Sequence, residues 1–289
     1  MKPSRSTFLD VRGLRYHVRE WGEQGAPKMF VFHGWMDSSA SFQFMVDAFA
    51  REWHVLAADW RGYGLTGRPQ ADCYWFPDYV ADLDRILAHY SLDTSVNLVG
   101  HSMGGNIACL YGGIRPQRVA KIVNLEGFGM PATRPEDAPR RYARWLDELA
   151  DQPTLRDYES VDAFAARLMR GNSRLTAERA RFVAENWSEP LPNGHVRILG
   201  DPAHKIVNPT LYRLEESMAC WRAVTAPVLW VVGAHTETLK QMHLTEADHE
   251  ARKRCFARLE AHTIPEAGHM LHHDQPEALA RLVETFLAD

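Results

Sequence analysis

The chain has few cysteines, no long hydrophobic run and no repeats. Its four cysteines are Cys73, Cys109, Cys220 and Cys255, and they form no Cys-x-x-Cys pair, which indicates reduced, partly buried thiols. No apolar run reaches transmembrane length, and no signal-type apolar segment follows residues 1–7. We therefore expect a cytoplasmic protein that has no membrane as a partner.

The chain also has no large excess of positive or negative charge, since its net charge is only −4. That balance argues against nucleic acid or an anionic surface as a partner. Hydrophobic residues make up 45% of the 289 residues, which is enough for a sizeable core. The length fits one large α/β domain, or one core with an inserted subdomain.

Short apolar runs alternate with helical patterns over much of the chain. Residues 8–11 and 14–21 predict an antiparallel hairpin at a sheet edge. Buried strands are predicted at 28–32, 55–59, 96–99, 121–125, 227–233 and 259–264, and helices at 41–51, 79–90, 246–256 and 276–287. Because parallel strands need crossover helices, this rhythm predicts a mostly parallel, doubly wound α/β sheet covered on both faces.

The rhythm stops between residues 131 and 215, where helical patterns occupy 142–149, 161–169 and 176–187. We expect a helical cap at 131–215, inserted after the sixth strand into a core formed by 1–130 and 216–289. Such an insert would lie over the carboxyl ends of the strands, where open α/β sheets bind ligands.

The stretch from residue 96 to 111 combines an apolar strand, Gly-x-Ser-x-Gly at Gly100–Gly104, and a helical pattern. This context predicts a nucleophile elbow, in which flanking glycines allow a strained serine to project above the sheet. Ser102 is the candidate nucleophile. The N-terminus of the following helix favours negative charge that develops beside it.

Four motifs together resemble the α/β-hydrolase family. They are His33-Gly34, Asp59-x-Arg61-Gly62-x-Gly64, Gly100-His101-Ser102-Met103-Gly104-Gly105 and Gly268-His269. They occur in the same order as in the family. The resemblance covers the chain from near residue 8 to the end, except for the insert, which matches the family's variable cap in position. The resemblance implies the α/β-hydrolase fold and a hydrolytic reaction.

A serine hydroxyl needs a base within reach, and His269 follows the last strand after a flexible Gly268. We expect His272 and His273 to be exposed polar residues at a turn, although one of them could line the pocket. A metal cluster of His269, His272, His273 and Asp274 fits no metal template well. The expectation is therefore that the protein holds no metal and needs no cofactor.

The position of the acid that would orient His269 departs from the family pattern. The family places it in Gly-x-x-Asp after the strand that ends at Gly233, but this chain has Thr236 there. Glu237 comes one residue late, and Glu126 ends the preceding strand. A buried carboxylate is costly unless it is paired, so Glu126 is favoured and Glu237 stays open as the alternative acid.

Two backbone N–H groups are expected to form an oxyanion hole, from Met103 and from Trp35. Candidate pocket residues are His33, Met36, Phe128 and Met130, although His33 also suits a role in bracing its loop by hydrogen bonds. Asp59 and Arg61 are expected to tie the loop that shapes the floor of the site.

These residues predict a serine hydrolase that cleaves a carboxylic ester or thioester through an acyl-enzyme intermediate. The expected partner is a small molecule with an apolar acyl or aryl group. Carbon–carbon bond hydrolysis and lactone opening use the same residues and remain alternatives. Haloalkane and epoxide reactions are disfavoured, because those family members have an aspartate in place of Ser102. A ligand-binding protein without turnover is the alternative from another class.

Overall fold

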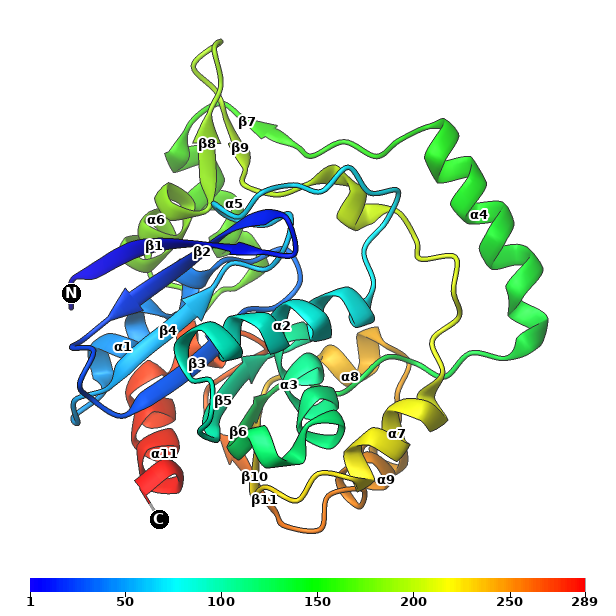
Figure 1. Ribbon diagram of the computed structural model, residues 1–289. Coiled ribbons are helices and arrows are strands. Elements are labelled where there is room, and N and C mark those ends of the chain that lie inside the picture. Colours follow the sequence, from blue (N-terminus) through cyan, green and yellow to red (C-terminus); the bar gives the residue numbers. More distant parts are fainter. Residues whose placement is uncertain (289) are drawn as a thin grey trace.

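The computed structural model describes residues 1–288, which form an eight-stranded sheet with helices on both faces (Figure 1). The strand order is β1-β2-β4-β3-β5-β6-β10-β11. The strands are β1 (Ser4–Val11), β2 (Leu14–Trp21), β3 (Lys28–Phe32), β4 (His54–Ala58), β5 (Val96–His101), β6 (Val119–Leu125), β10 (Val228–Gly233) and β11 (Leu259–Ile264). β2 pairs antiparallel with β1 and β4, and the remaining pairs are parallel. The predicted fold class and edge hairpin are confirmed.

Each face of the sheet buries its own hydrophobic core. In β3, Phe30 and Phe32 contribute to one core while Met29 and Val31 contribute to the other, as expected for a strand covered on both sides. The first face carries α2 (Phe76–Tyr90), α3 (Met103–Ile114), α7 (Leu214–Arg222) and α9 (Glu246–Lys253); the second carries α1 (Gln43–Ala48), α10 (Leu271–Asp274) and α11 (Pro276–Ala288). The helix predicted at 41–51 is shorter, because a 3-10 turn, η1 (Ser39–Phe42), precedes it.

Residues 131–215 form the three predicted helices and also a small sheet that the sequence did not predict. The helices are α4 (Ala138–Ala150), α5 (Val161–Gly171) and α6 (Ala177–Asn186), and the strands are β7 (Asp157–Tyr158), β8 (Ser188–Pro190) and β9 (Val196–Ile198). Strands of two or three residues are too short to show alternation, so only the turn-rich segment between β8 and β9 marked this hairpin. The remaining short elements are η2 (Pro116–Arg118), η3 (Pro135–Asp137), η4 (Pro202–Lys205) and α8 (Thr238–Gln241).

Two parts of this insert differ in how they are held. α5, α6 and the small sheet share a core around Phe164, Ala180 and Val196. α4 buries no residue and lies apart from the sheet, joined to the rest by extended chain (Figure 1). The insert also meets the loop after β4, where Gly64 N–H donates to the carbonyl of Leu199 at 3.1 Å.

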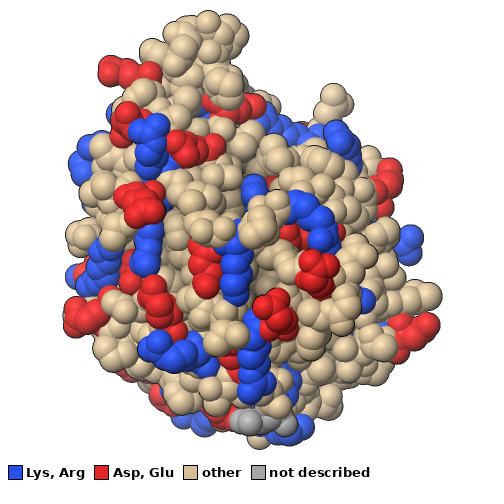
Figure 2. Space-filling model, turned by 90° about the vertical axis from the view of Figure 1, so that its left-hand side faces the viewer, with Lys and Arg blue, Asp and Glu red and all other residues tan. Residues whose placement is uncertain are grey.

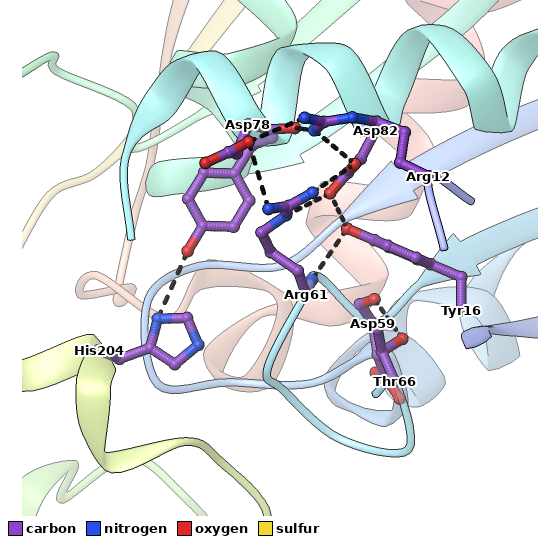
Figure 3. Close-up of polar contacts among 9 residues, drawn as sticks. Arg12, Tyr16, Asp59, Arg61, Thr66, Asp78, Asp82 and His204 are labelled. Atoms are coloured by element: carbon purple, nitrogen blue, oxygen red, sulfur yellow. Dashed lines mark hydrogen bonds and ion pairs between the residues drawn. The ribbon is translucent and has the colours of Figure 1, made fainter. Parts of the chain in front are cut away.

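A network of ion pairs and hydrogen bonds around the buried Asp82 holds the loop after β4 against α2 (Figure 3). Arg61 binds both carboxylate oxygens of Asp82, with Nε at 2.6 Å and Nη2 at 2.8 Å. The Tyr16 hydroxyl donates to the same carboxylate at 2.5 Å, and Arg12 donates to it at 3.0 Å. Asp82 is fully buried, so these donors compensate for the cost of removing its charge from water.

Asp59 fixes the other end of this loop. Its carboxylate accepts from the backbone N–H of Ser39 at 2.6 Å and of Leu65 at 2.9 Å, and it pairs with His17 Nδ1 at 2.7 Å. Burial raises the pKa of Asp59, but the contact with His17 and these hydrogen bonds outweigh burial and hold the pKa well below its usual range. Asp59 and Arg61 therefore brace the loop, as the sequence suggested.

The face that lies to the left in Figure 1 carries both signs of charge. Figure 2 shows lysine and arginine side chains interspersed with acidic ones across it, without a broad field of one sign. In residues 1–288, every helix is too short or too polar to cross a lipid bilayer.

Candidate active site

Ser102 lies in a sharp turn between β5 and α3. Its φ of 51° and ψ of −112° are strained for a residue with a side chain. The flanking glycines are required, because a Cβ on Gly100 would lie 2.3 Å from the carbonyl oxygen of Gly104, and one on Gly104 would lie 2.2 Å from that of Phe32. The Ser102 N–H donates to the carbonyl of Leu125 at 2.7 Å, which ties the elbow to the end of β6.

The loop after β3 passes directly against this elbow. A Cβ on Gly34 would lie 3.2 Å from Cβ of Ser102, so the following Trp35 begins beside the nucleophile. Met103 is the first residue of α3, and its N–H therefore has no partner within the helix. The two backbone groups predicted to bind an oxyanion thus lie on the two segments that meet at Ser102.

His33 braces this loop and lies away from the cavity. Its Nε2 accepts from the Trp60 N–H at 2.9 Å, so the proton belongs on Nδ1, which lies 2.7 Å from the carbonyl oxygen of Gly34. Burial lowers the pKa of His33 to about 4, and the neutral ring suits this pair of bonds.

Glu126 lies at the end of β6 with its carboxylate against His269. Oε2 lies 3.0 Å from His269 Nδ1, and Oε1 accepts from the Gly233 N–H at 2.8 Å. The Thr236 hydroxyl donates to Oε2 at 2.5 Å. The Glu126 side chain is fully buried, whereas 35% of the His269 side chain is exposed. A buried carboxylate therefore contacts an imidazole that is partly exposed to solvent.

Glu237 does not reach His269. It is exposed at the start of α8, and within residues 1–288 no hydrogen bond or ion pair involves its carboxylate. Thr236, which occupies the family's usual acid position, instead binds the carboxylate that comes from β6. Thr238 was not predicted; its Oγ1 lies 2.9 Å from His269 Nδ1 and 3.3 Å from Glu126 Oε2.

His269 and Ser102 lie on neighbouring loops, but no hydrogen bond joins their side chains in the part of the chain that the structure describes. The link between the loops runs through His101, whose Nε2 lies 2.8 Å from the carbonyl oxygen of His269. The rings of His101 and His269 are 4.7 Å apart. Because Nδ1 of His269 faces Glu126, Nε2 is the nitrogen left to take a proton from Ser102, and catalytic contacts are often long in the absence of substrate.

His272 and His273 are buried in α10, so the expectation of exposed turn residues is wrong. Nε2 of His272 lies 2.8 Å from the Ser41 hydroxyl, and Nε2 of His273 lies 2.7 Å from it. Burial lowers the pKa of His273 to about 4 and places that of His272 well below its usual value. α10 packs against η1 and α1, a contact between distant segments that local sequence did not reveal.

Among the described residues, Asp37, His101 and His272 bring one potential metal ligand each within 4.8 Å of one another. This group differs from the one considered in the sequence, since Asp274 accepts from the Gly268 N–H at 2.8 Å. Burial raises the pKa of Asp37 to about 7. Ser41 and the His269 carbonyl already occupy one nitrogen of each histidine, so the group forms part of the hydrogen-bond network behind the elbow.

A cavity of about 1030 Å³ opens above Ser102. That volume is at the upper end for small-molecule sites. Phe128 and Met130 line it, together with Trp35 and Met103. His33 and Met36 were also candidate pocket residues, but Met36 packs against the core and neither is among the lining residues. The cavity wall is largely aromatic and aliphatic, with contributions from α2, α3 and residues 207–217.

Comparisons of this chain with family models, curated proteins and solved structures agree on one family. A family model described as alpha/beta hydrolase fold matches residues 27–276. A serine hydrolase-like protein of Danio rerio is 25% identical over 92% of this chain and 83% of its own length. Epoxide hydrolase 4 of Homo sapiens is 26% identical over 99% of this chain and 80% of its own length. The solved thioesterase domain from the curacin biosynthetic pathway has a TM-score of 0.87 at 23% identity, over 98% of this chain and 99% of that one.

Proposed function

Because this chain belongs to the α/β-hydrolase family, we propose that it is a serine hydrolase that cleaves a carboxylic ester or thioester. The observation that carries the proposal is the 3.0 Å contact between His269 Nδ1 and Glu126 Oε2, beside a serine at φ 51°. An imidazole oriented by a buried carboxylate can take a proton from a neighbouring hydroxyl. The names of the Danio rerio relative and of the curacin thioesterase domain are compatible with this chemistry.

In the proposed reaction, Ser102 attacks the substrate carbonyl while His269 takes the hydroxyl proton. Glu126 stabilises the resulting imidazolium, and the N–H groups of Met103 and Trp35 bind the developing oxyanion. His269 then gives the proton to the leaving group, which leaves an acyl group on Ser102. A water molecule, activated by His269, hydrolyses that ester and restores the serine.

The epoxide hydrolase relative does not alter this proposal. Family members that open epoxides use an aspartate at the elbow, and its carboxylate forms an ester with the substrate. This chain has Ser102 there. We assign the expected cap role to residues 131–215, because the indole of Trp35 donates to the carbonyl of His204 at 3.2 Å and both residues line the cavity.

The test uses p-nitrophenyl esters of increasing acyl length and a fluorophosphonate probe on wild type and Ser102→Ala. We expect the probe to label wild type alone, and turnover by Ser102→Ala to fall by about 10⁴-fold or more. An unreactive wild type would favour a binding protein on the same fold.

A further inference from the structure

Charged side chains that line the large cavity are paired, with one exception. Arg115 lies 3.7 Å from Asp84, Arg213 lies 4.0 Å from Glu216, and Glu126 binds His269. Arg141 lines the same cavity, yet among residues 1–288 it has no ion pair or hydrogen bond. Arg141 is half-buried, so its guanidinium is accessible to an anion that enters the cavity.

The position of Arg141 on α4 directs it inward. Arg141, Trp145 and Glu148 follow one another at helical spacing and are all half-buried. Glu148 anchors this face, because its Oε2 accepts from the Val207 N–H at 2.6 Å, and its other oxygen binds Arg144. Arg140 by contrast is 87% exposed and lies 3.3 Å from Asp137. Arg141 is thus the arginine of α4 that faces the cavity without a partner.

Arg141 also borders a second, smaller cavity of about 390 Å³. Its other lining residues are Ala132, Thr133, Asp137, Arg140 and Arg144. Arg140 pairs with Asp137 and Arg144 with Glu148, so Arg141 is the arginine of this cavity that lacks an ion pair among residues 1–288. Arg141 therefore borders both the largely apolar cavity above Ser102 and a smaller cavity lined by three arginines. Together, the apolar cavity wall and Arg141 would accommodate a molecule that is apolar near its reacting carbonyl and anionic at its far end.

We infer that the substrate carries a carboxylate or phosphate remote from the scissile bond, and that Arg141 binds this anion. The inference rests on the proposed hydrolase function. Arginine presents two parallel N–H groups to such an anion, which gives both affinity and orientation. The anion would replace the partner that Arg141 lacks, while the aromatic walls hold the apolar portion.

Matched substrates test the inference. For carboxylates the pair is p-nitrophenyl octanoate and mono-p-nitrophenyl suberate; for phosphates it is octanoyl-N-acetylcysteamine and octanoyl-coenzyme A. We expect wild type to favour the anionic member of at least one pair by about tenfold or more in kcat/KM, mainly through KM. Arg141→Gln should bring that ratio close to one. Arg181→Gln on α6, where Arg181 pairs with Asp162 and Glu185, should keep the wild-type ratio.

Equal kcat/KM values within both pairs would overturn the anion site and leave the hydrolase proposal intact. A loss in Arg141→Gln that is the same for charged and neutral members would also overturn it, because it would show a structural role. Binding of monomethyl suberate and methyl octanoate to Ser102→Ala, followed by tryptophan fluorescence, needs no turnover. An anionic preference there that Arg141→Gln removes would support the site even if hydrolysis were absent; no preference would refute it.

Discussion

The two carboxylates Asp82 and Glu126 are equally buried but have different partners. Asp82 binds two arginines and a tyrosine, all within 3.0 Å, and its own side chain is fully buried (Figure 3). Glu126 binds backbone, threonine and one histidine whose ring is partly exposed. A permanent cation keeps its charge and locks a loop, whereas a histidine can gain and lose a proton. The partner, more than the depth of burial, separates a structural carboxylate from one suited to catalysis.

Removing the charge of Glu126 should have the largest effect. Gln keeps the size of the side chain but cannot stabilise the imidazolium form of His269, so Glu126→Gln should lower kcat by about 10³- to 10⁴-fold on a p-nitrophenyl ester. Glu237→Gln is the matched control and should stay within about twofold, because Glu237 is exposed and, within residues 1–288, its carboxylate makes no hydrogen bond or ion pair with His269. Equal, small losses in both variants would remove Glu126 from the proposed triad.

Removing the charge of Asp82 should affect stability. Asp82→Asn leaves Arg61 buried beside a neutral amide, and we expect the free energy of unfolding to fall by about 3–5 kcal/mol in urea titrations. Asp78→Asn is the comparison on the same helix. Asp78 also contacts Arg61, at 3.3 Å, and Arg12, at 3.1 Å, but its side chain is 26% exposed, so this change should cost clearly less, about 1 kcal/mol. A loss of about 1 kcal/mol or less in Asp82→Asn, equal to that in Asp78→Asn, would show that the buried carboxylate of Asp82 contributes little to stability.

The smallest effect concerns Glu20, a third buried carboxylate. Burial raises its pKa, but hydrogen bonds from His54, Arg5 and Tyr90 outweigh burial and lower the pKa to about 2. The native state therefore binds fewer protons than the unfolded state between pH 4.5 and 2, and this stability is lost as the pH falls through that range. Between pH 6 and 3, wild type should lose about 1–2 kcal/mol more than Glu20→Gln in urea titrations. Parallel pH profiles would contradict the assignment.

The parts of the candidate site that could be proposed from the sequence depend on local motifs. Ser102 and its glycines occupy consecutive positions, and Glu126 follows a recognisable strand, so both could be located without coordinates. The burial of His272 and His273 could not be predicted, because it depends on how α10 packs against η1 and α1. The inward direction of Arg141 likewise depends on Glu148 anchoring α4 at Val207, a contact between residues 59 positions apart.

α4 borders the large cavity but contributes little to the hydrophobic core. No side chain of this helix is fully buried, so most substitutions there should cost little in folding free energy. Under the proposed role of Arg141, random mutagenesis restricted to residues 138–150 should change substrate preference while leaving the contact between Glu126 and His269 in place.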